Sequence, residues 1–262
     1  MNSDPLAHGL GRIVTRALLS PALRGMRPAR ALYAALYLWG KRIAEPRQRR
    51  FFADQVEPGM VVFDVGANLG FYTTLLADLV GPAGHVHAFE PDPLSFGILA
   101  GRTAKRANVE SHQTAVGDHT GSITLYCHRS NRADNRVHPS LGDETAEAVE
   151  VPLTTLDDYC DTRRIARIDA VKIDVQGAEV AVLAGFERTL ARTQPRWLLI
   201  EFSPAHLRAA DSSPEAFWAI LDALGFDPWT FDDDGRAVPI ADTAAVSRRF
   251  EAGYTDLWAR RR

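Results

Sequence analysis

From residue 51 onward, short apolar runs alternate with longer segments whose apolar residues recur every three or four positions. The short runs are typical of buried strands, and the longer segments are typical of helices that pack one face on a sheet. Strands separated by helices favour a parallel sheet covered on both faces. The pattern predicts strands over Val61–Val65, His85–Phe89, Glu110–Gln113, Val171–Val175, Trp197–Phe202, Pro228–Phe231 and Asp256–Ala259, and helices over Tyr72–Val80, Pro93–Ala107, Ala178–Arg192 and Pro214–Leu224.

Two further alternating segments lie between the third and fourth of these strands. Ser122–Tyr126 and Glu147–Leu153 place apolar side chains at every second position, so we expect them to pair as an added hairpin. The whole pattern predicts the α/β class, with a three-layer α/β/α domain over residues 51–262.

The first 50 residues have a different character. Leucines are mixed with arginines in a helical pattern that Pro21 and Pro28 interrupt, and ten basic residues face only two acidic ones, Asp4 and Glu45. The segment therefore carries a charge near +8, while residues 51–262 carry a charge near −11. We predict a basic helical extension over residues 1–50. It is expected to pack against the domain or its pocket, with peripheral contact to a membrane surface as the alternative.

Composition adds few constraints. Hydrophobic residues make up 46% and charged residues 24% of the 262, as in ordinary globular proteins. Cys127 and Cys160 form no metal or disulfide motif, which favours a reducing compartment and a cytoplasmic location. No apolar run is long enough to span a membrane, and the oligomeric state stays open.

The segment Val61–Thr73 (VVFDVGANLGFYT) is the most informative part of the chain. It predicts a buried strand, a glycine turn and a helix. Glycine allows the backbone to approach a ligand, and N–H groups at the start of a helix can bind polar ligand atoms. The next strand ends at Glu90, where a carboxylate can accept hydrogen bonds from ribose hydroxyls. These features predict a site for a cofactor that carries a nucleoside.

Two cofactors are compatible with such a site. A dinucleotide fold would place a glycine two residues after Gly66, but this chain has Asn68 there, and Asp64 would repel a diphosphate. S-adenosylmethionine has no phosphate. The carboxylate of Asp64 suits its ammonium group, and the N–H groups of the turn suit its carboxylate. Adenosylmethionine is therefore favoured over NAD.

Three motifs resemble the FkbM family of class I methyltransferases. They are Val65-Gly66-Ala67-Asn68 with Gly70, Tyr72 and Thr73; Phe89-Glu90-Pro91; and Lys172–Glu179 (KIDVQGAE), followed by Glu201-Phe202. The resemblance covers about residues 51–262. It implies S-adenosylmethionine as cofactor, a Rossmann-like seven-stranded, mostly parallel sheet, and O-methylation of a small metabolite, sugar or natural-product precursor. The expected cofactor-binding residues are Asp64, Gly66, Ala67, Asn68, Gly70, Tyr72, Thr73, Glu90, Pro91, Ala115 and Asp118.

The adenine is expected against Phe89, Pro91 or the segment from Ala115 to Asp118. Asp118 is the candidate for the adenine amino group, and an ordinary turn residue is the alternative. Asp174 and Glu201 follow or end later strands, so they should lie at the same rim. They are the expected catalytic residues, because an aliphatic hydroxyl must lose a proton during methyl transfer. A cap for the helix near Gly177 is the alternative for Asp174, and two acids alone are too few to predict a metal site.

The segment Cys127–Ser140 is dense in polar side chains and should reach over the rim. Asn135 and Arg136 are the expected acceptor-binding residues together with Asp174, and His138 is a candidate general base. A solvated loop is the alternative. His206 is a minor candidate, Glu179 is expected to be a first-turn helix acid, and His85 and His87 are expected to be structural.

Three functions remain open from the sequence. The favoured one is an adenosylmethionine-dependent methyltransferase acting on a small-molecule or glycan acceptor. The alternatives are an NAD-linked oxidoreductase and a non-catalytic binding module on the same scaffold. Because residues 51–262 are acidic, no nucleic-acid partner is expected.

Overall fold

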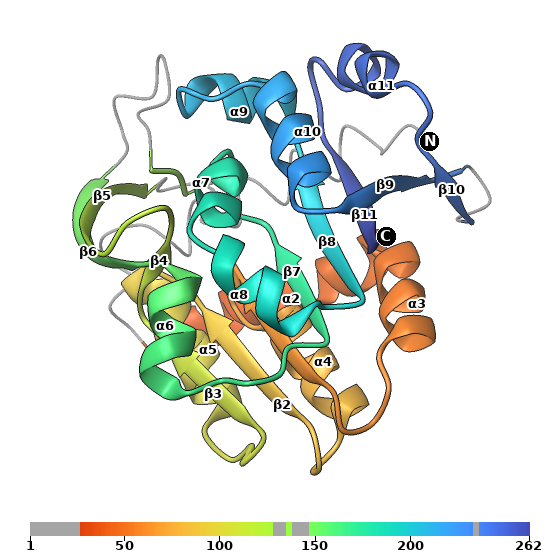
Figure 1. The fold of residues 1–262 in the computed structure, drawn as a ribbon. Coiled ribbons are helices and arrows are strands. Elements are labelled where there is room, and N and C mark those ends of the chain that lie inside the picture. Colours follow the sequence, from red (N-terminus) through yellow and green to blue (C-terminus); the bar gives the residue numbers. More distant parts are fainter. Residues whose placement is uncertain (1–26, 128–134, 138–146, 233–235) are drawn as a thin grey trace.

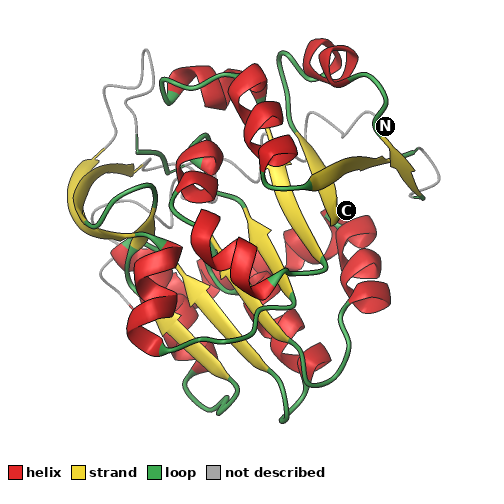
Figure 2. Cartoon of the chain, viewed as in Figure 1, coloured by secondary structure: helices red, strands yellow, loops and turns green. Residues whose placement is uncertain are grey.

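A computed structural model describes residues 27–127, 135–137, 147–232 and 236–262. A central sheet separates two layers of helices (Figures 1 and 2). In Figure 1, α6 (Leu156–Arg163) and α8 (Glu187–Thr193) lie in front of the sheet, and α4 (Phe71–Val80) and α5 (Pro93–Thr103) lie behind it. The predicted three-layer α/β/α architecture is confirmed.

The central sheet has eight strands in the order β10-β9-β11-β8-β7-β1-β2-β3. The five strands from β8 to β3 in this order are parallel, and the three pairings that join β10, β9, β11 and β8 are antiparallel. The sequence predicted seven strands, and the additional one is β10, which has only three residues. The bounds are β1 Val61–Val65, β2 His85–Phe89, β3 Val109–His112, β7 Ala170–Ile173, β8 Trp197–Phe202, β9 Phe226–Phe231, β10 Ala237–Pro239 and β11 Thr255–Arg261.

The expected hairpin is present, but it belongs to a separate sheet. β5 (Gly121–Cys127) pairs antiparallel with β6 (Glu147–Thr154), and β6 also pairs with the two-residue strand β4 (Ala115–Val116). Leu125, Cys127, Val151 and Leu153 pack into a small apolar core of their own. This small sheet brings Ala115 and Leu125 to one wall of the main cavity.

Strand alternation sends neighbouring side chains into opposite cores. Phe63, Val171 and Leu198 face the core under α6, α8 and α10 (Pro214–Ala223). Val62, Ala170 and Leu199 face the core that includes α4. Asp64, Lys172 and Glu201 each lie two residues after one of this second set. The same alternation therefore turns them toward the side of α4.

The segment expected as a single helix over Ala178–Arg192 is two helices, α7 (Glu179–Ala184) and α8. Gly185 separates them, because the backbone of Gly117 passes so close to Gly185 that no side chain fits there. A Cβ there would lie 2.0 Å from the carbonyl oxygen of Gly117. Asp157 then accepts hydrogen bonds from the N–H groups of Arg188 and Thr189, at 3.1 and 2.7 Å, and so begins α8.

Three short helices were not predicted from the sequence, namely α6, α9 (Pro204–Ala209) and α11 (Thr243–Arg249). Each begins with a capping side chain, Thr155, Ser203 or Asp242, that accepts a backbone N–H. Conversely, the predicted helix over Pro93–Ala107 ends earlier, at Thr103. The three helices missed from the sequence, α6, α9 and α11, have six to eight residues, too few to show a clear apolar period.

Two helices precede the first strand: α2 (Arg27–Ala44) and α3 (Pro46–Gln55). The expected boundary at residue 50 falls inside α3, whose Phe51 and Phe52 are buried against Trp197. Residues 1–26 of the expected extension lie outside the described part of the chain. Among the described helices, none combines the length and the apolar character that crossing a bilayer requires.

His85 and His87 pack at the far end of β2 from the cavity, as expected for structural residues. His87 Nδ1 lies 2.8 Å from the hydroxyl of Tyr159, and burial lowers the pKa of His87 to about 3. Potential metal-ligand atoms of His85, His87 and Glu110 lie within 4.8 Å of one another, but the carboxylate of Glu110 is paired with Arg163. These contacts fit a packed polar cluster.

Candidate cofactor and acceptor site

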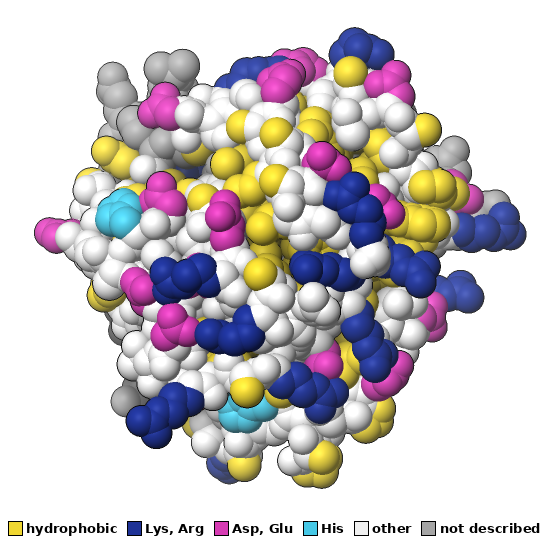
Figure 3. Space-filling model, in the orientation of Figure 1, with side chains coloured by type: hydrophobic (Ala, Val, Ile, Leu, Met, Phe, Trp, Pro, Cys, Tyr) yellow, Lys and Arg dark blue, Asp and Glu magenta, His cyan; other side chains and the backbone are white. Residues whose placement is uncertain are grey.

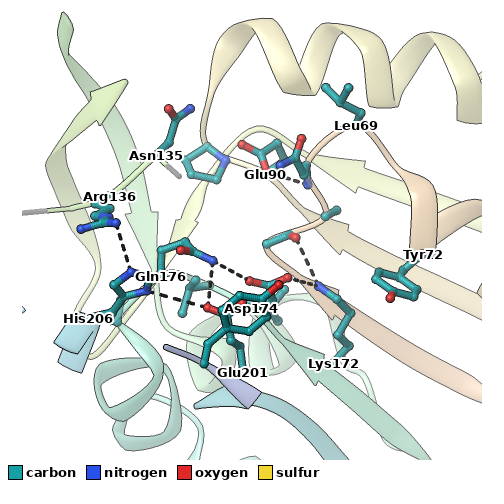
Figure 4. Close-up of a pocket in the computed structure, with 18 of the residues that line it drawn as sticks. Leu69, Tyr72, Glu90, Asn135, Arg136, Lys172, Asp174, Gln176, Glu201 and His206 are labelled. Atoms are coloured by element: carbon teal, nitrogen blue, oxygen red, sulfur yellow. Dashed lines mark hydrogen bonds and ion pairs between the residues drawn. The ribbon is translucent and has the colours of Figure 1, made fainter. Parts of the chain in front are cut away.

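A cavity of about 720 Å³ lies at the carboxyl ends of β1, β2, β7 and β8. Its volume is in the range of sites that enclose a drug-sized ligand. The turn after β1 and the start of α4 form one wall, the small sheet forms another, and α2 covers a third. Figure 4 shows the side chains that point into it.

The glycine turn after β1 is shaped by two close approaches. Gly66 has φ +79°, and a Cβ there would lie 1.8 Å from the carbonyl oxygen of Asp174. Gly70 has φ +78°, and its Cβ would lie 2.7 Å from Leu99. Asn68 also takes a left-handed conformation, with φ +49°. Gly66, Ala67, Asn68 and Tyr72 line the cavity, whereas Gly70 supports the turn from behind.

Three N–H groups of this turn donate to the end of β2 and are therefore not available to a ligand. Those of Gly66 and Ala67 donate to the carbonyl of Phe89, at 3.0 and 2.9 Å. That of Asn68 donates to Glu90 Oε2 at 2.7 Å. The turn therefore binds the end of β2 and fixes the position of Glu90.

Glu90 has the position expected for a ribose-binding carboxylate. It lines the cavity directly after β2, and its second oxygen accepts the N–H of Asp92 at 2.9 Å. Burial, with a smaller effect from Asp92, raises the pKa of Glu90 to about 8. Each oxygen retains acceptor capacity beyond its backbone hydrogen bond, so the pair can receive two hydroxyl groups.

Asp64 and Thr73 were expected to contact the cofactor, but the structure does not bring them into the cavity lining. Both side chains are fully buried beneath the turn, where Thr73 Oγ1 donates to Asp64 Oδ2 at 2.6 Å. The other oxygen of Asp64 lies 3.3 Å from Lys172 Nζ. Asp64 therefore supports the site through Lys172, because its position inside β1 turns it into the protein.

Asp118 is also misplaced in the prediction. Its side chain is 58% exposed, pairs with His119 at 2.7 Å and lies outside the cavity lining. The turn alternative describes it correctly. The wall available to an adenine instead contains Phe89, Pro91 and Ala115, together with Val116 and Leu125.

Lys172 is the buried cation of the site. Its Nζ lies 3.3 Å from Asp64, 3.5 Å from Asp174 Oδ2 and 5.4 Å from the centre of the Tyr72 ring. Burial opposes its charge, but Asp174 and Asp64 outweigh burial and raise the pKa of Lys172. Burial likewise opposes the charge of Asp174, yet Lys172 and then Lys41 hold the pKa of Asp174 below its usual value. Asp174 is therefore ionised at neutral pH.

Gln176 joins the two expected catalytic acids. Its Nε2 donates to Asp174 Oδ1 at 3.1 Å and to Glu201 Oε1 at 3.0 Å (Figure 4). Burial and the negative charge of Asp174 raise the pKa of Glu201. Gln176 thus joins two carboxyl groups whose pKa values are shifted in opposite directions, and Asp174 is the ionised member.

Glu179 holds the loop that carries Gln176. Its buried carboxylate accepts the N–H groups of Val175 and Gly177 at 3.2 and 3.0 Å, and Gln176 between them has φ +55°. The expected role of Glu179 as a first-turn helix acid agrees with this position. Asp174 does not cap α7, because the helix begins after Ala178 without a side-chain capping hydrogen bond.

The N-terminal helix α2 contributes residues that the sequence did not suggest. Lys41 pairs with Glu45, and Glu45 accepts a hydrogen bond from the hydroxyl of Tyr72. Tyr37, Lys41 and Glu45 all line the cavity. The spacing of Lys41 and Glu45 is an ordinary helical pair, and only the path of the chain shows that it faces the site.

The acceptor side of the cavity contains Asn135 and Arg136, as predicted, and His206. The backbone of Arg136 pairs with Tyr126 of β5, which places its Nη2 3.1 Å from His206 Nε2. His206 Nδ1 lies 3.8 Å from Glu201. His138, the expected general base, lies outside the described residues.

These residues fit S-adenosylmethionine. The main observations are the buried carboxylate of Glu90 at the strand end, the apolar wall of Phe89, Pro91 and Ala115 next to it, and the place at Gly66 where no side chain fits. Glu90 would hold the ribose and the apolar wall would hold the adenine. The reactive end would then face Asp174 and Glu201.

Comparison with known proteins gives an independent result. The model of the methyltransferase FkbM domain matches residues 64–228. The chain is 34% identical over 206 residues to the 31-O-demethyl-FK506 methyltransferase FkbM of Streptomyces tacrolimicus, which covers 66% of this chain and 74% of that protein.

Two further relatives are more distant. The 2-O-methyltransferase NoeI of Sinorhizobium fredii is 26% identical over 58% of this chain and 66% of its own length. The hexuronic acid methyltransferase AglP of Haloferax volcanii is 26% identical over 54% of this chain and 56% of its own length. Among solved structures, a SAM dependent methyltransferase from Aquifex aeolicus has a TM-score of 0.43 at 14% identity, over 84% of this chain and 95% of that one, a likeness too weak to support an argument.

Proposed function

Because this chain belongs to the FkbM family of methyltransferases, which use S-adenosylmethionine, we propose that it methylates a hydroxyl oxygen of a small metabolite, a sugar or a natural-product precursor. The two alternatives from the sequence, an NAD-linked oxidoreductase and a non-catalytic module, are set aside by this membership. The names of two relatives, a 31-O-demethyl-FK506 methyltransferase and a 2-O-methyltransferase, support oxygen as the acceptor atom.

The observation that carries the proposal is the bridged pair of Asp174 and Glu201 in the same cavity as Glu90. When bound, S-adenosylmethionine supplies an electrophilic methyl group on a sulfonium centre. The protein must then align an acceptor oxygen with that group and receive the proton which the oxygen loses.

Asp174 is the residue suited to accept this proton. Its ionised carboxylate can hold an acceptor hydroxyl by a hydrogen bond before the reaction. The low pKa that Lys172 imposes is no obstacle, because the hydroxyl becomes strongly acidic as its oxygen bonds to the methyl carbon. Gln176 keeps the carboxylate oriented, and Glu201 holds the other side of Gln176.

Arg136 and Asn135 support recognition of a polar acceptor. Both line the cavity on the side of His206, and the guanidinium of Arg136 can donate to hydroxyl, carboxylate or phosphate oxygens. An acceptor rich in oxygen atoms, such as a sugar, fits this wall. We further propose a reducing, cytoplasmic setting, because Cys127 and Cys160 are both buried free thiols.

The test uses Asp174→Asn and methyl-labelled S-adenosylmethionine. Cell extracts and a panel of sugars are screened for a product that gains one methyl group, and the variant is then compared with the wild type on that product. We expect unchanged binding of S-adenosylhomocysteine and turnover lower by roughly 100-fold or more, as for loss of a general base. Wild-type turnover in the variant would show that Asp174 is only structural.

A further inference from the structure

The outer face of α2 carries an apolar stripe. Leu32, Leu36, Trp39 and Ile43 are 50%, 43%, 65% and 60% exposed. Their spacing of four, three and four residues places them along one side of the helix. The opposite side of α2 is turned inward, because Tyr33 is buried and Lys41 lines the cavity.

The stripe lies beside the mouth of the cavity. Leu36 belongs both to the stripe and to the cavity lining. Among the described residues, the remaining large exposed apolar side chain is Tyr254, which is 62% exposed and also lines the cavity. Exposed apolar surface therefore gathers around the entrance to the site, where a contiguous patch indicates an interaction surface.

The same segment concentrates the positive charge of a net acidic chain. Residues 27–55, which form α2 and α3, contain seven basic and two acidic residues, a net charge near +5. Residues 1–26 add three arginines and one aspartate, while residues 56–262 carry a charge near −10. Arg42 on α2 and Arg50 on α3 are exposed, and the charge of Lys41 is offset by Glu45.

We propose that the apolar stripe of α2 docks on a bilayer containing anionic lipids, with the mouth of the cavity toward the bilayer. A helix with an apolar face and a basic surround lies in the plane of such an interface. Basic residues near an anionic leaflet are attracted by its negative surface potential. Trp39 suits the headgroup region, where tryptophan is enriched.

Charge favours lipid over two other occupants of the stripe. A second copy would bring two helical segments of net charge near +5 together. Residues 1–26 are themselves net positive, so folding back onto α2 would also join like charges. An anionic surface is the partner that complements the charge as well as the apolar side chains.

The test is co-sedimentation of the full chain with phosphatidylcholine vesicles, with and without phosphatidylglycerol. We expect the wild type to bind the anionic vesicles and to bind neutral ones at least tenfold more weakly. The variant Leu32→Gln/Trp39→Gln/Ile43→Gln alters exposed residues outside the cavity lining, so it should fold. It should bind S-adenosylhomocysteine as the wild type does and lose at least tenfold in vesicle affinity.

A pair of charge variants gives the matched control. Arg42→Gln/Arg50→Gln should weaken vesicle binding several-fold, whereas Arg188→Gln/Arg192→Gln, in the helix layer on the other side of the sheet, should leave it unchanged. Three results would overturn the proposal: no binding of the wild type to anionic vesicles at low salt, a dimer that the stripe variant converts to a monomer, or binding that appears only after residues 1–26 are removed. The last two would assign the stripe to a second copy or to that segment.

Discussion

At the scale of single residues, Lys172 organises the site, since it is a buried cation that contacts two carboxylates on neighbouring elements. Replacing it with Met would leave Asp64 charged, buried and without its cation. We expect Lys172→Met to lower the free energy of unfolding by roughly 3–5 kcal/mol in urea titrations. The double variant Lys172→Met/Asp64→Asn should recover part of that loss, and equal stability of the single variant and the wild type would refute this role.

Glu90 should make stability depend on pH. Its folded-state pKa of about 8 lies above the usual value for glutamate, so the folded chain retains a proton that the unfolded chain releases. That contribution is fully present below the unfolded pKa, near 4.5, and is lost as the pH rises through about 8.

Thermal unfolding without cofactor can measure this contribution. Between pH 5 and pH 8 the wild type should lose stability relative to Glu90→Gln, which cannot titrate. A difference between the two proteins that does not change with pH would contradict the assigned pKa. Burial lowers the pKa of His87, so its effect on stability has the opposite pH dependence below pH 6.5. Both proteins contain His87, so this effect cancels in the comparison.

Of the two acids expected at the cofactor, Glu90 lines the cavity and Asp64 does not, for a physical reason. Glu90 follows the last residue of β2, where the chain leaves the sheet at the cavity. Asp64 lies one residue before the end of β1, and its strand partner is Lys172. The ion pair between these strands depends on sheet order and register, which a single sequence does not specify.

At the scale of elements, the start of α7 fixes the loop that carries Asp174 and Gln176. Glu179 holds the loop by accepting hydrogen bonds from two backbone N–H groups. Burial raises the pKa of Glu179 to about 7. We expect Glu179→Ala to cost about 1–3 kcal/mol of stability, because the buried donors of Val175 and Gly177 lose their partner. The rate constant kcat should fall more than the affinity for S-adenosylhomocysteine.

A matched control is available on the next helix. Glu187 is also the first residue of its helix, α8, but it is exposed. Glu187→Ala should leave kcat unchanged and have at most a small effect on stability. Similar kinetic losses in the two variants would argue against a specific role for the loop after β7.

Elements with a strong apolar pattern were predicted well. The bounds of β1, β2 and β8 agree with those expected from the sequence, because each strand is mostly apolar and is followed by a polar residue or a glycine. The break between α7 and α8 was missed because it depends on the backbone of Gly117, which is distant in sequence. The sequence led us to expect that residues 1–50 pack against the domain or its pocket, but it did not show that Tyr37, Lys41 and Glu45 are the residues that line the cavity.

At the scale of the whole molecule, charge is distributed unevenly between the two sides of the sheet. On the face shown in Figure 3, over α6 and α8, basic and acidic side chains are interspersed, and Arg188 and Arg192 both pair with Asp161. The excess of basic residues belongs to α2 and to α3, which lies at the right edge of the sheet in Figure 1. This asymmetry was visible in the sequence, whereas the side chains that α2 turns toward the cavity could be identified only from the fold.

The measurement that tests the central claim most directly is calorimetric titration of the full chain with S-adenosylhomocysteine, for the wild type and Glu90→Ala. We predict one binding site in the wild type and a loss of about 1–3 kcal/mol in the variant, or roughly 5- to 150-fold in Kd. Absence of binding heat in the wild type, or equal affinity in the two proteins, would contradict a nucleoside held by Glu90 in this cavity.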